Sequence, residues 1–173
     1  MSRFWLNVKD WLEAASYLFV AMGIIFAGYQ FIISIQANKE QTSVAYILES
    51  QSDKLVEARL DLQKFWMNYP VGQITDKPGS HEVIDELAMS FIFPSGKAPN
   101  TDNLIRTVEF LDLIGTCVSA LVCDKMIMEK HFGEYVSALS CLYQAPLKRL
   151  RTDQNLSNLG VSMKALLPKS TEC

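Results

Sequence analysis

The most informative absence in this chain is one of charge, because no charged residue stands between Glu13 and Lys39. Within that interval, residues 14–35 are almost wholly apolar and have no polar face, which excludes an amphipathic helix on the surface of a soluble domain. At about 1.5 Å of rise per residue the run makes a helix of about 33 Å. A hydrocarbon core is about 30 Å thick, and a helix satisfies its own backbone there. The sequence therefore predicts a transmembrane helix over residues 14–35.

Several motifs of known chemistry are also missing. The chain has two histidines, and its four cysteines do not have the spacing of a zinc site. It holds no glycine-rich phosphate loop, no HExxH and no GxSxG. These absences leave no metal, no cofactor and no small-molecule substrate to predict. The net charge of −3 argues against a nucleic-acid partner.

A cleaved signal peptide is the alternative interpretation of the apolar run. Such peptides have an apolar core of about 7–15 residues and a small-residue cleavage site. The run here is longer, and residues 35–37 match the cleavage pattern poorly. We therefore expect an uncleaved single-pass anchor in the cell inner membrane, with the lipid bilayer as a partner. Residues 1–13 are either an interfacial amphipathic segment, with Trp5 and Trp11 at headgroup depth, or the first turns of the spanning helix.

Two features of the predicted span bear on association between helices. Gly23 and Ala27 form a small-xxx-small pair, which lets two helices approach closely. Gln30 is the one strongly polar side chain of the run, and it either hydrogen-bonds to a partner helix or reaches toward the nearer interface. We therefore expect self-association or pairing with another protein.

The segment 36–69 reads as one long helix, with no Gly or Pro between it and the span. Its apolar positions alternate four and three residues apart, which is the spacing of a left-handed coiled coil. Two interpretations stay open: a parallel coiled-coil dimer or larger assembly, or an amphipathic helix packed on its own domain. The positions that define the spacing are Val44, Leu48, Gln51, Leu55, Ala58, Leu62, Phe65 and Tyr69.

The rest of the chain reads as a helical domain at 70–153 and a polar tail at 154–173. No stretch shows the alternation of a strand. The fold class is therefore predicted to be all-α, with one N-terminal transmembrane helix, a long membrane-proximal helix and a small helical domain. Apolar periodicity and the Gly and Pro positions predict helices at about 82–93, 101–122, 125–132 and 134–151, with at most a short helix at 159–167.

The cysteines indicate a compartment. On one helix Cys117 and Cys123 would lie about 9 Å apart, which is too far for a disulfide. Their neighbours and those of Cys141 are apolar, so we expect buried free thiols and a reducing environment. Basic residues near the two ends of the span are almost balanced and do not decide the orientation. We therefore predict that the C-terminal domain is cytoplasmic.

Glu109, Asp112 and His131 are the candidates for an enzyme site. Glu109 and Asp112 are three residues apart on a helix that is otherwise apolar, so they either share a cleft or form its solvated edge. No nucleophile stands next to a base in the sequence. We therefore predict no catalytic residue and keep, as the alternative, a small membrane-bound enzyme built on these three side chains.

Residues 102–153 resemble an uncharacterised bacterial family, a domain of unknown function found in single-span, membrane-anchored helical proteins. The shared pattern is an acidic-aromatic pair, an Asp that starts the next helix, a Phe-Gly turn and a basic residue near the last helix. The resemblance covers about a third of the chain and implies this architecture without an activity. The matching positions are Glu109, Phe110, Asp124, Phe132, Gly133 and Arg149 or Arg151.

These features favour a membrane-anchored, non-enzymatic interaction or assembly protein with a cytoplasmic helical domain. One variant is an effector or accessory subunit of a bacterial defence or toxin module, in which assembled single spans would disrupt a membrane. That variant follows from analogy of architecture alone. The residues expected to carry the interaction are Gly23, Ala27, Gln30, Leu48, Gln51, Leu55, Leu62 and Phe65.

Overall fold

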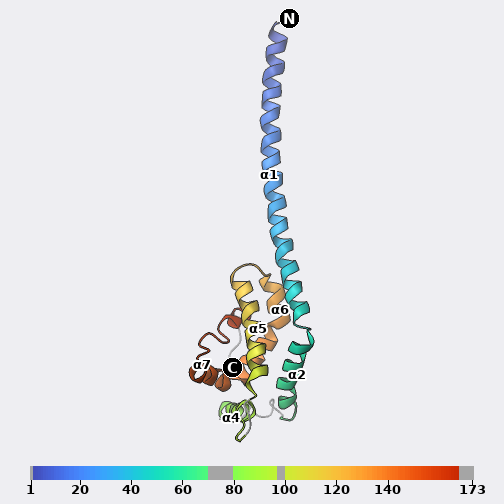
Figure 1. Cartoon of the computed structure of the whole chain (residues 1–173). Coiled ribbons are helices and arrows are strands. Elements are labelled where there is room, and N and C mark those ends of the chain that lie inside the picture. Colours follow the sequence, from blue (N-terminus) through green and yellow to red (C-terminus); the bar gives the residue numbers. More distant parts are fainter. Residues whose placement is uncertain (1, 70–79, 97–99, 168–173) are drawn as a thin grey trace. The chain divides into compact units, whose positions relative to one another are not determined.

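The computed structural model describes residues 2–69, 80–96 and 100–167, and the regular elements within them are all helical. This confirms the all-α fold class. Outside the described part lie residues 1, 70–79, 97–99 and 168–173, together with the side chains of residues 2–10, Trp5 included, and of residues 12, 14 and 80. The elements in chain order are α1 (Ser2–Glu49), α2 (Asp53–Met67), α4 (Ser80–Ile92), α5 (Thr101–Ser119), α6 (Lys125–Leu142), α7 (Gln144–Asp153) and the short 3-10 helix η1 (Ser162–Leu166) (Figure 1).

The chain divides into two compact units, Met1–Asn38 and Lys39–Cys173. The first unit is the N-terminal part of α1, which contains the apolar run. The stretch Ala15–Glu49 of this helix contains a window with a mean hydropathy of 2.1, none of which is buried. By length and composition the helix can cross a membrane, as predicted. A signal sequence near an N-terminus has the same form.

The second unit begins with the end of α1, where the chain turns. The prediction of one helix over 36–69 is wrong at this point. Ser50 Oγ donates to the Ile47 carbonyl at 2.6 Å, and the Ser50 carbonyl accepts from Arg59 Nη2 at 2.8 Å. Serine hydroxyls compete for backbone groups in this way and favour helix ends over helix interiors. Ser52 then has the extended backbone of an N-cap residue, and α2 follows it.

This break divides the predicted heptad spacing between two helices. On α1, Val44 and Leu48 are 49% and 63% exposed. On α2, Ala58 and Leu62 are buried in the domain. A continuous coiled coil over 36–69 is therefore wrong, and α2 is the amphipathic helix packed on its own domain that the sequence left as the other interpretation.

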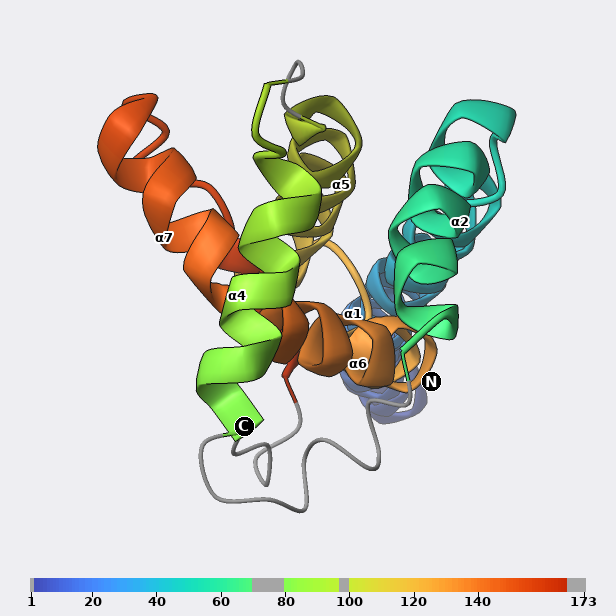
Figure 2. The same cartoon turned by 90° about the horizontal axis from the view of Figure 1, so that it is seen from below.

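The core of the second unit is built around α5. This helix packs against α2 and, over its C-terminal half, against η1. Its inward residues Leu104, Val108, Leu111 and Ile114 are each at most 1% exposed. Figure 2 shows α4 and α7 on one side of the unit and α2 on the other, with α6 between them. The four-residue and three-residue spacing of these apolar side chains explains why α5 forms a helix with one fully buried face.

The helix boundaries of α6 and α7 differ from the prediction. Asp124 caps α6 as its position suggests, since its carboxylate accepts from the Ile127 N–H at 3.0 Å. The predicted boundary between helices at 125–132 and 134–151 is wrong, because α6 continues through the buried Gly133. The chain breaks instead at Tyr143. Pro146 falls in the first turn of α7, where its missing N–H removes no helical hydrogen bond.

The predicted polar tail at 154–173 contributes to the core over its described part. Met163 and Leu166 of η1 are 1% and 0% exposed. Gly115 of α5 makes this packing possible, because a Cβ at that position would overlap the backbone of Ser162. The tail is therefore a structural part of the domain, held where α5 presents its smallest side chain.

Candidate functional site

Two open grooves flank α2. The first lies between α2, the end of α4 and the start of α5, and it has a volume of about 590 Å³. Its lining combines polar side chains such as Asp102 and Asn100 with two stacked rings, Phe65 and Phe91, whose centroids are 4.2 Å apart. We call it the polar groove.

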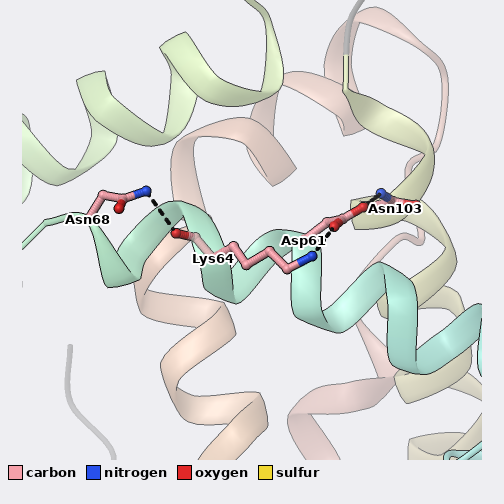
Figure 3. A network of polar contacts seen from close by, with 4 residues as sticks. All are labelled: Asp61, Lys64, Asn68 and Asn103. Atoms are coloured by element: carbon pink, nitrogen blue, oxygen red, sulfur yellow. Dashed lines mark hydrogen bonds and ion pairs between the residues drawn. The ribbon is translucent and has the colours of Figure 1, made fainter.

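A hydrogen-bonded network forms one wall of the polar groove (Figure 3). Asn103 Nδ2 of α5 donates to Asp61 Oδ2 at 3.2 Å, and Lys64 Nζ lies 3.3 Å from Asp61 Oδ1. Asn68 Nδ2 donates to the Lys64 carbonyl at 3.2 Å. Both oxygens of Asp61 are engaged, so the network ties α2 to α5 instead of presenting a free carboxylate. An exposed ion pair of this kind contributes only about 0–1 kcal/mol.

The second groove lies between α2 and α6, has a volume of about 360 Å³ and is mainly apolar. We call it the apolar groove. Trp66 and Met67 line it from α2, and Ala138 and Leu142 line it from α6. Met67 is 83% exposed, so this apolar surface continues from the groove onto the outside of α2. A concave site of this size with apolar and aromatic walls is the usual form of a binding site.

Two tyrosines and one tryptophan bring polar atoms into the apolar walls of this groove. Tyr143 OH donates to the Leu62 carbonyl at 3.0 Å, and burial raises the pKa of Tyr143, opposed by its interaction with the Trp66 indole. Burial also raises the pKa of Tyr135 to about 12, with the Arg59 charge opposing the rise. Both phenols are therefore protonated at neutral pH. Tyr135 OH and Trp66 Nε1 are both buried without a hydrogen-bond partner. The indole N–H of Trp66 therefore lies near Tyr143 without forming a well-aligned hydrogen bond to it.

The predicted interaction residues of the span lie on the helix of the first unit. Gly23, Ala27 and Gln30 are all exposed there. A Cβ added at Gly23 would meet no atom within 4 Å. Gly23 and Ala27 are one helical turn apart and so share a face, which is open to a second helix.

The five predicted interaction residues after the span separate from one another. Leu48 is exposed on α1, and Gln51 lies in the turn that follows it. Leu55, Leu62 and Phe65 lie on α2, and only Leu62 is fully buried. Leu62 lines both grooves and Phe65 lines the polar one. The structure thus brings two of the five to the groove walls and leaves the other three outside both grooves.

The candidate enzyme residues do not converge. Glu109 and Asp112 line a shallow cavity of about 360 Å³ beside the turn after α7, and His131 is exposed on α6 and does not line it. Asp112 Oδ1 accepts from the Met163 N–H at 2.8 Å, and its Oδ2 accepts from the Gly160 N–H at 2.5 Å. The carboxylate of Asp112 therefore holds the chain that leads into η1. The sequence does not predict this role of Asp112, because the N–H groups that donate to its carboxylate lie far along the chain.

The cysteine prediction is wrong. Cys117 and Cys123 form a disulfide with their Cα atoms 5.3 Å apart. The sequence argument placed both on one helix, but α5 ends at Ser119 and the chain folds back after it. Cys141 is disulfide-bonded as well, to a partner outside the described residues. No cysteine within residues 2–69, 80–96 and 100–167 is free. The argument for a reducing compartment is therefore lost.

Helical spacing identifies most of the apolar groove, including Leu62 of α2, but misses Trp66. The apolar periodicity of residues 134–151 predicts five inward side chains, and all five line the groove: Tyr135, Ala138, Leu139, Leu142 and Tyr143. Trp66 is not among the predicted residues, although it stands one helical turn after Leu62 and the same spacing selects it.

In the part of the chain that the structure describes, no three His, Cys, Asp or Glu side chains are grouped so as to hold a metal ion. Comparison with protein-family models, with curated proteins and with solved structures finds no match to this chain.

Proposed function

We propose that this chain is a single-pass, membrane-anchored and non-enzymatic interaction protein that binds a partner protein through the apolar groove. The observation that carries the proposal is the open apolar groove between α2 and α6, continuous with the exposed Met67. An anchor supplied by the first unit would hold this binding domain at a membrane.

The shape and chemistry of the groove support a protein as the partner. Its walls hold Trp66, Tyr135 and Tyr143, the residue types that dominate binding energy at protein interfaces. Exposed apolar surface on α2 adds to the groove: Met67 at its edge is 83% exposed, and Leu60, outside the groove, is 45% exposed. Exposed apolar surface next to an open groove is typical of a site that another protein covers.

We also propose that the folded domain lies in an oxidising compartment, on the outer side of the membrane, and not in the cytoplasm as the sequence suggested. Two observations support this orientation: the Cys117–Cys123 disulfide and the disulfide-bonded state of Cys141. Structural disulfides form and persist outside the reducing cytoplasm. The near balance of basic residues around the apolar run is compatible with either orientation.

The interaction is tested by site-specific photocrosslinking of the full-length chain in its membrane. A photoreactive residue replaces Met67, which is 83% exposed beside the groove, or Leu113, which is 50% exposed on α5 and lines neither groove. We expect a defined covalent adduct from position 67 and none from position 113. The mass of that adduct distinguishes a second copy of the chain from a different protein.

The matched control fills the groove without disturbing the core. Ala138 is exposed and lines the groove, so Ala138→Arg places a long charged side chain across the site while α6 stays packed. This variant should lose the adduct at position 67 and keep the unfolding temperature of the wild type. An adduct that survives Ala138→Arg, or one that forms equally at position 113, would remove the groove as the binding site.

A further inference from the structure

The turn between α5 and α6 presents apolar side chains to solvent. Leu121, Val122 and Met126 are 71%, 51% and 74% exposed, and we call these three residues the apolar tip. The Cys117–Cys123 disulfide closes the turn at its base. The N–H groups of Val122 and Cys123 both donate to the Cys117 carbonyl, at 3.0 and 3.2 Å. The tip is therefore a constrained projection of the domain.

The backbone of the tip has an uncommon conformation. Leu121 has a φ of 60°, in the left-handed region that Gly or Asn usually occupies. Packing inside the domain does not account for a leucine here, since the side chain points into solvent. An apolar residue held outward at a strained position indicates a contact outside the domain.

The tip lies beside the part of α1 that belongs to the second unit. The Asp124 N–H donates to Ser43 Oγ at 2.8 Å, and Ser43 is fully buried. Further along, Ser50, directly after α1, and Thr107 of α5 line one small cavity. From Ser50 back to Ser43 α1 rises about 10 Å, whereas α5 rises about 18 Å from Thr107 to Ser119 in the same direction. The tip therefore extends beyond Ser43, toward the start of the second unit.

We propose that the apolar tip inserts into the interfacial layer of the same bilayer that holds the span. Ser43 is the eighth residue after residue 35, where the apolar run ends. The covalent chain thus brings a lipid surface to this end of the domain, whereas any protein partner would have to be recruited there. Bilayer interfaces accept apolar side chains to a depth of about 5–10 Å. The inference rests on the proposed membrane anchor.

Quenching of tryptophan emission by brominated phospholipid tests the insertion. The full-length chain carries Trp5→Phe and Trp11→Phe, which removes the tryptophans next to the span and leaves Trp66, which is 8% exposed in the core. Leu121→Trp or Met126→Trp then reports from the tip, and Met67→Trp, at a position 83% exposed on α2, is the matched control. Each protein is reconstituted in phosphatidylcholine vesicles with and without bromine on the acyl chains.

We expect both tip variants to lose a severalfold larger fraction of their emission to brominated lipid than the Met67→Trp control. Equal quenching at the tip and the control would overturn the insertion. Blue-shifted emission from the tip tryptophan that brominated lipid does not quench would also overturn the insertion, because the tip would then be covered by protein and not by lipid. A chain that does not float with the vesicles would overturn the anchor itself, so failure of the proposed function is seen separately, before any quenching is measured.

Discussion

Gly115→Ala is the substitution whose effect follows most directly from the structure. A Cβ at this position would overlap the carbonyl group of Ser162 and contact the backbone nitrogen of Met163 at 2.9 Å. All of these are backbone atoms, so no rotation of a side chain relieves the contact. The added methyl group can be accommodated only if η1 moves away from α5.

The expected magnitude follows from opposing effects. Replacing Gly by Ala inside a helix stabilises it by about 0.5–1 kcal/mol. Forcing an extra carbon into a packed core costs about 1–3 kcal/mol. Displacing η1 also loosens Met163 and Leu166, and burial of one such side chain contributes about 1.5–3 kcal/mol. We therefore expect a net loss of about 2–4 kcal/mol, out of about 5–15 kcal/mol for a typical domain.

Denaturant unfolding of the full-length protein in detergent measures this loss through the emission of Trp66, with Trp5→Phe and Trp11→Phe in the background. Ser119→Ala, on an exposed residue of the same helix, is the control and should leave the midpoint within error of the wild type. A Gly115→Ala midpoint equal to or above that of the wild type would refute the close approach of η1 to α5.

Four further outcomes are expected. Tyr135→Phe should raise the free energy of unfolding by about 1 kcal/mol, because it removes a buried hydroxyl without a partner. Tyr143→Phe should lower it by about 1 kcal/mol, because it removes the hydrogen bond to the Leu62 carbonyl. Equal effects of the two substitutions would contradict this difference between the two hydroxyls. Burial raises the pKa of Tyr135 from 10.0 to about 12, so the folded state keeps a proton that the unfolded state loses. Stability should then fall as the pH rises through that window, by up to about 1.4 kcal/mol per pH unit, and alkaline unfolding of Tyr135→Phe should show a smaller fall. Protein taken from its native membrane and denatured should react with a maleimide reagent only after reduction; labelling of its four cysteines without a reductant would place the domain in the cytoplasm. Gly23→Ile should lower the mass of the protein–detergent complex if the Gly23–Ala27 face pairs two spans, and Gly28→Ile, on another face of the same open helix, should not; identical masses would remove this face from any assembly.

Local patterns predicted much of the domain because the responsible interactions are close in sequence. The predicted helices at 82–93 and 101–122 correspond to α4 and α5, whose apolar faces are set by spacing within each helix. The same reasoning joined α1 and α2, because no Gly or Pro marks the turn between them. The turn depends on Arg59 holding the Ser50 carbonyl, a contact that only the packed chain provides.

The candidate site shows the same division. Periodicity placed Leu62 and Tyr143 inward, but the groove that they line exists only because the fold brings α2 and α6 to its two walls. The enzyme alternative rested on Glu109 and Asp112 being close in sequence. Spacing alone could not show that the Asp112 carboxylate accepts hydrogen bonds from the N–H groups of Gly160 and Met163.

The sequence by itself determined that residues 14–35 form an apolar helix long enough to cross a membrane, because the absence of charge and the length of the run are local properties. Only the tertiary structure decided the state of the cysteines and the place of the C-terminal segment. Cys117 and Cys123 pair because α5 stops between them, and η1 docks because Gly115 leaves room for its backbone. Both outcomes depend on which segments of the chain come into contact. Close packing of the whole domain determines those contacts, and the pattern of a single segment does not.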